Sequence, residues 1–596
     1  MKKGKRFSDR FYGGIIVSLL VSSSAVLGSV GWIEYLGSAS GLTWTDVAYR
    51  LLTLFTVNAS FDQPGVPLAL DLARFLSPLA VAGTVVFVAM SFFRSRMQAF
   101  SARYAMRGHA VFYGFDKRAA ALASDISAER KVLCIARSAE EAMRAAEMGA
   151  ASIFEESAFS QSFIACGLRR ARCLFVMTES DVLAQEASRS AEDFLRNIRR
   201  SRKAGGLKRL PSIFVGYSDE SALRIAREFD EAAENTPDGR SESVRVFRFN
   251  PELHLARAIV DTHVLGSLPN PEMLRAAVFG FAGIGQAIAF EIAQTAHFGD
   301  LSLPRISLCD RGIEASFDEF LARHPGFDAA ASAEVVEASQ WKNVFSNELP
   351  DVAFISFDDS SLALETARVL RQLSVLAGKQ TRIIVIPPLG REGSYPSEEC
   401  CGGYLRSQDI VLVDSDGLVN GLDIMRRAED CDVLAKGIHF SWLASESMRW
   451  DSELIDAEWD RLSDVLRDSN RYAARHLLVK LRFLGWHFVS GSAGGDGGEK
   501  FELESYPRKI LEQLGRMEHN RWAAEKLLAG YLPYADSSDS RYSAFKAKYH
   551  LHANLVPWES LSEEDQRKDL NALKYANEIA AAAGLRLARI CPAGED

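Results

Sequence analysis

The stretch AAVFGFAGIGQAIAFEIAQ at residues 276–294 decides the fold of the central part of this 596-residue chain. An apolar run, a glycine-rich turn and an amphipathic run follow one another, which is the strand–turn–helix order of a dinucleotide-binding unit. The turn holds Gly280, Gly283 and Gly285, a GxxGxG spacing permuted from GxGxxG. The next apolar run, RISLCD, ends at Asp310, where a carboxylate can hold the ribose hydroxyls of adenosine. The pattern predicts a nucleotide site for NAD or an adenine nucleotide; the alternative is an empty Rossmann-like lobe.

Two further apolar runs extend this unit to residues 274–430. They are DVAFISFDD at 351–359 and TRIIVIPP at 381–388, and the first places Asp358 and Asp359 at the carboxyl end of a strand. Ligands of parallel sheets bind at that edge, although acidic pairs in loops are commonly just solvated.

A similar alternation of strands and helices occupies residues 108–265. Strand-like runs at 109–114, 131–136 and 173–177 are separated by amphipathic segments, which predicts a second doubly wound parallel sheet. Its turn begins at Gly114, but Asp116 replaces the glycine that would let the backbone approach a pyrophosphate. We therefore expect a structural lobe, with Arg118 or Arg137 as the alternative phosphate ligand.

Two uncharged stretches near the beginning of the chain, residues 11–33 and 75–93, have the length that a membrane-spanning helix requires. Basic residues cluster before the first stretch and after the second, so we expect a multi-pass protein of the inner (plasma) membrane with both termini cytoplasmic. A cleaved signal peptide is the alternative for the first stretch.

Between these stretches, an apolar helix-compatible run at 43–57 leads into an irregular loop. This plan resembles the pore region of two-span potassium channels, in which a pore helix enters the membrane and a loop returns as the filter. The family motif TVGYG followed by Asp is matched in part, without its glycines and with one extra residue. The pore-like loop comprises Thr56, Val57, Asn58, Ala59, Ser60 and Asp62. The alternative is an interfacial hairpin loop without a pore.

The C-terminal part, residues 431–594, carries mostly helical patterns. Its stretches MEHNRWAAEKLLAGY (517–531) and NLVPWESLSEEDQRKD (554–569) resemble the RyR domain, the repeat named for ryanodine receptors. The resemblance implies a helical module that binds a ligand or partner. Glu518, His519, Arg521 and Trp522 are the candidate pocket, because an aromatic ring and an arginine suit a base and a phosphate. The alternative is a core tryptophan beside an internal ion pair.

Composition narrows the function classes. A net charge of −9 argues against nucleic acid as a partner, and the eight cysteines show no metal-ligand spacing, so we expect no metal. No Walker A loop, HExxH motif or convincing nucleophile is present in the sequence, so we expect no enzyme.

The order of parts, with a lobe directly after a membrane helix and a second lobe in tandem, resembles potassium channels with RCK (TrkA-N-like) domains. This resemblance implies a homotetramer in the lipid bilayer whose cytoplasmic ring senses a nucleotide or an ion. Two alternatives stay open: a non-conducting, membrane-tethered sensor or effector of a nucleotide-derived signal, and a membrane-bound oxidoreductase, which rests only on the glycine turn.

Overall fold

The structure, a computed structural model, describes most of the chain. The described residues are 8–37, 43–61, 65–155, 158–201, 210–234, 244–267, 273–298, 303–390, 398–419, 432–443, 452–490, 500–534 and 548–590, with 395, 421, 424, 541, 542 and 546. The chain divides into two compact units, residues 1–111 with 131–171, and residues 112–130 with 172–596.

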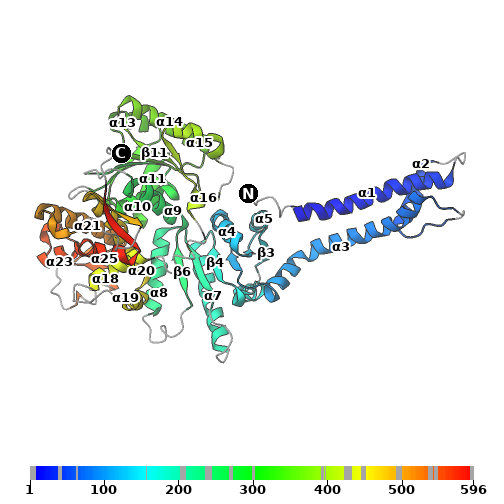
Figure 1. Cartoon of the computed structure of the whole chain (residues 1–596), viewed down its shortest axis with the longest axis horizontal. Coiled ribbons are helices and arrows are strands. Elements are labelled where there is room, and N and C mark those ends of the chain that lie inside the picture. Colours follow the sequence, from blue (N-terminus) through cyan, green and yellow to red (C-terminus); the bar gives the residue numbers. More distant parts are fainter. Residues whose placement is uncertain are drawn as a thin grey trace. The chain divides into compact units, whose positions relative to one another are not determined.

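Three helices open the first unit: α1 (Ser8–Leu36), α2 (Trp44–Phe55) and α3 (Leu68–Tyr104). Figure 1 shows α1 and α3 as two long helices drawn in blue. Windows at Ser18–Leu36 and Leu68–Val85 are long and apolar enough to cross a membrane, and only 22% of each is buried within the protein. Most of each window is therefore exposed on this chain, unlike the core helix of a soluble protein.

Close helix packing holds these three helices together. A Cβ on Gly31 would lie 2.7 Å from the Cα of Leu70 in α3, and one on Gly28 would lie 2.6 Å from Leu51 in α2. The Trp32 ring stacks on Phe61 with centroids 5.6 Å apart. Small residues on α1 therefore permit the close approach of α2 and α3.

The first sheet has the strand order β3-β2-β1-β4-β5-β6, and each pairing whose register is known is parallel. Stacked rings of Phe112, Phe175, Phe214 and Phe247 cross four of its strands, with centroids 4.8–5.2 Å apart. Its elements are β1 (Ala110–Tyr113), α4 (Lys117–Glu129), β2 (Val132–Ala136), α5 (Ala139–Glu147), β3 (Ala151–Phe154), α6 (Phe159–Ala165), η1 (Leu168–Arg170), β4 (Cys173–Met177), α7 (Asp181–Ser201), β5 (Ser212–Gly216), α8 (Glu220–Glu234), β6 (Val246–Phe249), α9 (Pro251–Val260) and η2 (Asp261–Leu265).

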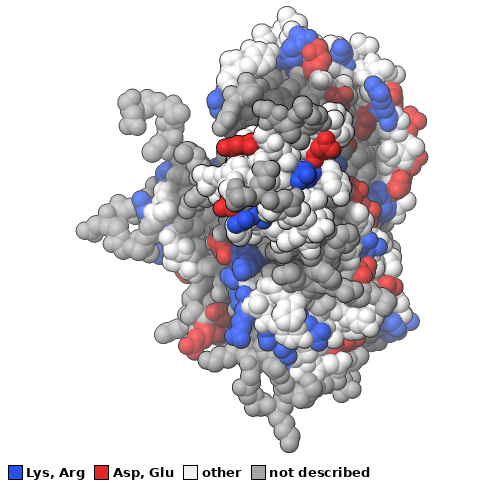
Figure 2. Space-filling view, turned by 90° about the vertical axis from the view of Figure 1, so that its right-hand side faces the viewer, with Lys and Arg blue, Asp and Glu red and all other residues white. Residues whose placement is uncertain are grey.

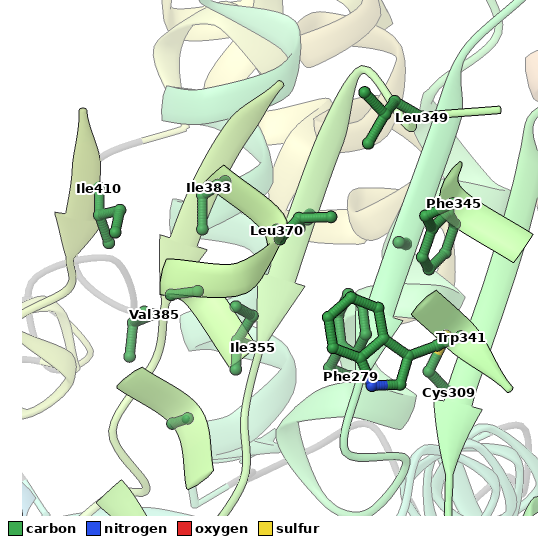
Figure 3. Packing of buried hydrophobic residues seen from close by; sticks show 14 of the residues in the cluster. Phe279, Cys309, Trp341, Phe345, Leu349, Ile355, Leu370, Ile383, Val385 and Ile410 are labelled. Atoms are coloured by element: carbon green, nitrogen blue, oxygen red, sulfur yellow. The ribbon is translucent and has the colours of Figure 1, made fainter. Parts of the chain in front are cut away.

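The second sheet is fully parallel and has the equivalent order, β12-β11-β10-β7-β8-β9. Figure 3 shows one face of it, where Phe279 packs against Trp341 and Phe345. Its elements are β7 (Arg275–Phe279), α10 (Ile284–Thr295), β8 (Arg305–Asp310), α11 (Ile313–Arg323), α12 (Phe327–Ala330), β9 (Ser332–Glu337), α13 (Trp341–Asn347), β10 (Val352–Ile355), α14 (Ser360–Leu376), β11 (Arg382–Val385), α15 (Glu398–Ser407), β12 (Ile410–Leu412) and α16 (Ser415–Leu418). The prediction of Rossmann-like parallel sheets is confirmed.

The C-terminal part is mainly helical, with two small two-stranded sheets, β13 with β16 and β14 with β15. Helix α20 lies against α10, α18 and α21. The elements are α18 (Val433–Leu443), α19 (Ser452–Arg461), α20 (Asp464–Phe483), β13 (Trp486–Ser490), η4 (Leu503–Ser505), α21 (Arg508–Leu528), β14 (Leu532–Pro533), β15 (Leu551–His552), η5 (Trp558–Ser560), α23 (Glu563–Lys568), α24 (Asn571–Lys574), α25 (Ala576–Ala582) and β16 (Leu585–Arg589).

Charged side chains of both signs lie interspersed over the described part of the face drawn in Figure 2. Such a mixed surface is ordinary for a protein that carries 69 basic and 78 acidic residues.

Candidate functional site

The glycine turn after β7 is built by two glycines that no other residue could replace without movement. Gly280 has φ +86°, and a Cβ there would lie 3.1 Å from the carbonyl of Ser356 at the end of β10. A Cβ on Gly285 would overlap the carbonyl oxygen of Gly280. The Ser356 hydroxyl donates to that same oxygen over 2.9 Å. Strand β7, helix α10 and strand β10 thus meet at the switch point of the sheet, where open α/β sheets bind ligands.

Between these two glycines, Ala282 and Gly283 are exposed, whereas Phe281 and Ile284 are buried. Ala282 stands where the second glycine of GxGxxG would be, so the turn corresponds to GxAxxG with Gly283 as an addition. Gly283 has φ +48° and provides no side-chain cap for α10. A helix N-terminus that is free of a capping side chain on its own turn offers N–H groups and a positive dipole end to an anion.

Asp310 lies directly beside this turn. Its Oδ2 accepts a hydrogen bond from the Phe281 N–H over 2.7 Å, and its Oδ1 accepts one from the Arg311 N–H over 2.7 Å. Each oxygen retains a further lone pair for a ligand hydroxyl. The structure therefore brings Gly280, Gly283, Gly285 and Asp310 together, despite the 30-residue gap between first and last.

The acidic pair at the end of β10 divides between two roles. Asp359 caps α14, because its Oδ1 accepts hydrogen bonds from Ser361 and Leu362 over 2.8 and 3.1 Å. Asp358 does not take part in that cap. Of this pair, Asp359 is therefore engaged as the cap of α14.

The equivalent turn of the first sheet is closed by its own side chains. The carboxylate of Asp116 caps α4 by accepting from the Ala119 N–H over 2.8 Å. Arg118 donates to the other Asp116 oxygen over 2.8 Å and to the Thr178 carbonyl over 3.1 Å. Since an aspartate already occupies the anion position, a phosphate would have to displace it.

The pore-like loop begins as a helix cap. The Val57 N–H donates to the Leu54 carbonyl over 3.4 Å, and the Asn58 N–H donates to the Thr53 carbonyl over 2.9 Å. This is the Schellman pattern, with Val57 at φ +58° in the position that usually holds glycine. Thr56 turns back onto the carbonyls of Leu52 and Thr53.

The remaining residues of that loop differ in exposure. Ala59 packs against the Trp32 cluster of the three opening helices, and Ser60 is exposed. Asp62, also predicted for the loop, lies outside the described residues. The described loop residues thus cap α2 and pack on α1.

In the C-terminal part, Glu518 and Arg521 belong to a buried charge cluster rather than to an open pocket. Glu518 Oε2 lies 2.7 Å from Lys480 Nζ and 3.0 Å from His476 Nδ1, while Oε1 accepts from Arg521 over 2.8 Å. Arg521 also pairs with Glu525 at 2.6 Å. Burial alone would raise the pKa of Glu518, but Arg521 and Lys480 hold that pKa well below its usual value. The alternative of an internal ion pair is therefore what the structure shows for Glu518 and Arg521.

Trp522 lies nearer the surface of this module than His519, which is buried. His519 Nε2 lies 2.8 Å from the Val556 carbonyl oxygen, and its ring stacks on Trp522 with centroids 5.8 Å apart. Trp522 is half-buried and meets the edge of His552 at 4.8 Å. Trp522 is therefore partly accessible from solvent, whereas the ion pairs of Glu518 and Arg521 are buried. The helical spacing of Glu518 and Arg521 could not predict that Lys480 and His476, about 40 positions earlier in the sequence, would be their partners.

Among the described residues, no group of three or more His, Cys, Asp or Glu side chains could hold a metal ion. Cys134, Cys166, Cys173 and Cys309 are buried, and no disulfide joins any two of these four. Burial raises the pKa of the Cys166 thiol to about 12, so this thiol is inert.

Comparisons by sequence find no relative: no protein-family profile and no curated protein matches the chain. By structure, the chain is similar to GsuK bound to ADP, with 13% identity, 70% of this chain and 97% of that chain covered, and a TM-score of 0.34. It is also similar to the GsuK channel bound to NAD, with 13% identity, coverage of 72% and 85%, and a TM-score of 0.33. A dipicolinate synthase from Bacillus halodurans matches at 9% identity, coverage of 54% and 99%, and a TM-score of 0.20. Likenesses this distant carry no argument about function.

Proposed function

We propose that this chain is a membrane-anchored nucleotide sensor whose second Rossmann lobe controls a ligand-gated, potassium-channel-like membrane region. The observation that carries the proposal is the contrast between the two turns. The turn at α4 is closed by Asp116, whereas the turn at α10 has no cap of its own, is exposed, and lies beside Asp310. A ligand that places a phosphate at the N-terminus of α10 and a ribose at Asp310 is an adenine nucleotide or NAD.

Asp310 also sets an expected preference. A carboxylate that accepts the ribose 2′-hydroxyl repels a 2′-phosphate, so NAD should bind in preference to NADP. ADP and NAD, the ligands of the two GsuK structures, are the first probes to try.

The proposed organisation follows the order of parts along the chain. Residues 1–107 form the bilayer region with both termini cytoplasmic, 108–265 and 274–430 form tandem RCK-like lobes, and 431–594 form an RyR-like module. Four chains would assemble the membrane region and a cytoplasmic ring in the inner (plasma) membrane. The RyR-like module would receive a second ligand on its Trp522 side, because Glu518 and Arg521 are already saturated by buried partners. Catalysis is no part of the proposal.

One observation favours a second candidate, a non-conducting, membrane-tethered effector with the same nucleotide site. In the pore-like loop, the N–H groups of Val57 and Asn58 cap α2, and Ala59 packs against the Trp32 cluster. These contacts are those of a hairpin loop that joins two helices, and they account for this part of the loop without a pore.

Isothermal titration of the purified full chain in detergent with ADP, NAD and NADP tests the site. The parent chain should bind ADP and NAD, and Asp310→Ala should weaken both by at least about tenfold through the lost ribose contact. Asp318→Ala, which removes an exposed aspartate on α11, is the matched control and should bind like the parent. Equal binding by Asp310→Ala and the parent, or no binding to either, would reject the site.

Potassium flux from proteoliposomes distinguishes the two candidates. A channel should show flux that ADP or NAD changes, together with a tetrameric mass in detergent. Nucleotide binding without flux under any of these ligands would favour the non-conducting effector.

A further inference from the structure

Each Rossmann lobe packs a helical segment against the other lobe. Helix α9 follows β6 of the first sheet, yet it lies along α10 of the second sheet. In return, the segment after β12 reaches α4, where a Cβ on Gly421 would overlap the Leu122 carbonyl and lie 2.9 Å from Ile126. The two lobes therefore exchange helical segments, and the beginning of α9 lies at the turn of the second lobe, where Glu252 approaches Gly283.

This exchange places Glu252 at the candidate nucleotide site. Asn250 caps α9 by accepting from the Glu252 and Leu253 N–H groups over 2.9 and 3.0 Å, which fixes the first turn. A Cβ on Gly283 would lie only 3.2 and 3.3 Å from the two Glu252 carboxylate oxygens. The carboxylate of one lobe thus rests against the turn that begins α10 in the other.

Among the residues that the structure describes, the surroundings of Glu252 include no dedicated partner of opposite charge. Its charged neighbours are Arg118 and Asp116 of the first lobe's turn, and Arg118 is already committed to Asp116 and Thr178. Burial raises the pKa of Glu252; Arg118 counters this rise and Asp116 adds to it. Arg118 and the positive end of α10 are therefore the features that favour a carboxylate here.

We propose that Glu252 is a resident anion that competes with the ligand's phosphate groups for the N-terminus of α10, so that it sets the affinity and the phosphate selectivity of the site. The inference rests on the nucleotide site proposed above. A phosphate at the exposed Ala282–Gly283 turn and the Glu252 carboxylate are like charges within a few ångströms, which repel strongly in a partly buried site. Binding of a phosphate-bearing ligand therefore requires the beginning of α9 to withdraw, whereas a ligand without phosphate does not.

The test compares two ligands that differ only in their phosphates. ADP and adenosine are titrated calorimetrically into the parent full chain, Glu252→Gln and Glu348→Gln. The glutamine at 252 keeps the shape and removes the charge. Glu348→Gln makes the same charge change at the opposite edge of the same sheet, where Glu348 pairs with Arg275 and Arg305 at 3.1 and 3.4 Å. Glu252→Gln should bind ADP at least about tenfold more tightly than the parent, with adenosine affinity unchanged and Glu348→Gln like the parent.

Each other outcome has a defined meaning. If the parent binds ADP and Glu252→Gln binds it equally or more weakly, competition is overturned while the nucleotide site stands. If Glu252→Gln strengthens ADP and adenosine alike, Glu252 acts through shape rather than charge and the inference is overturned. If no variant binds ADP, the nucleotide site itself fails and this inference fails with it. A circular dichroism spectrum like that of the parent shows that Glu252→Gln is folded.

Discussion

Gly285→Ala is the substitution that the turn should tolerate least. The added Cβ would overlap the carbonyl oxygen of Gly280 and lie 3.0 Å from its carbonyl carbon, against an ordinary carbon–carbon separation of about 3.5–4.0 Å. Neither side can yield easily. The Gly280 N–H donates to the Cys309 carbonyl over 3.0 Å, and Ser356 holds the Gly280 oxygen from the other side.

The cost follows from these contacts. Overpacking a tight contact costs about 1–3 kcal/mol, and each hydrogen bond lost as the turn shifts adds about 1 kcal/mol. We expect a local destabilisation of about 2–5 kcal/mol and loss of ADP binding. Gly312→Ala is the matched control in the same lobe. Gly312 has φ +60° with nothing within 4 Å of its Cβ position, so only the backbone strain of about 1–2 kcal/mol applies.

Hydrogen exchange measured by mass spectrometry on peptides covering residues 275–295 reports the local effect directly. Gly285→Ala should exchange faster than Gly312→Ala in these peptides and should fail to bind ADP, while Gly312→Ala retains binding. Similar exchange and similar affinity in the two variants would refute the reasoning that α10 and β7 touch through Gly285.

Three further predictions concern stability. Glu518→Gln leaves the buried Lys480 and Arg521 short of a counter-charge and should lower the free energy of unfolding by about 3–5 kcal/mol, which tryptophan fluorescence would report as a lower melting temperature. As the control, Glu512→Gln, at a side chain on the surface of the same helix, should change the free energy of unfolding by less than about 1 kcal/mol. Burial and the nearby Glu518 raise the pKa of Asp569 to about 8, so the folded state holds its proton more tightly than the unfolded state, and the stability of the parent falls as the pH rises from about 4 to about 8. Asp569→Asn should therefore melt higher than the parent at pH 9 and similarly at pH 4, and a parallel pH dependence of the two melting temperatures would contradict this assignment. Val57→Gly removes the backbone strain of φ +58° at the end of α2 and should stabilise this helix end locally by about 1–2 kcal/mol. Hydrogen exchange at residues 53–58 should therefore slow, and unchanged exchange would contradict the left-handed helix cap at Val57.

Local patterns predicted the secondary structure around the candidate site well. The predicted strands form, because apolar runs bounded by turns carry their own signal; they begin at residues 110, 132, 173, 275, 305, 352 and 382. The turn of Gly280, Gly283 and Gly285 and the approach of Asp310 were also predictable. Strands β7 and β8 are adjacent in this topology, and their carboxyl ends must lie side by side.

Long-range choices were not predictable in the same way. Nothing in the residues of α9 shows that it packs on α10 of the other lobe, so Glu252 carried no signal as a site residue. The helical spacing of Glu518 and Arg521 correctly placed them side by side, yet whether they face solvent or a lysine depends on α20. Lys480 and His476 on that helix convert the predicted pocket residues into a buried ion cluster.

The asymmetry between the two turns gives the second lobe alone a route from ligand binding to movement. Asp116 belongs to the turn that it caps, so displacing it would act first on that turn. Glu252 belongs to α9, so a ligand that displaces it acts on a helix of the other lobe. Helix α20 contacts α9 and α10 away from the glycine turn. Its Arg475 pairs with Asp261, directly after α9, at 2.7 Å and with the fully buried Glu291 of α10. Because that end is fixed, withdrawal of Glu252 would pivot α9 about its contacts with α20, and a ligand of the C-terminal module that shifts α20 would move the same helix. The coupling between the two sites can be no larger than the difference in nucleotide affinity between the two positions of α9, which is the quantity that Glu252→Gln measures.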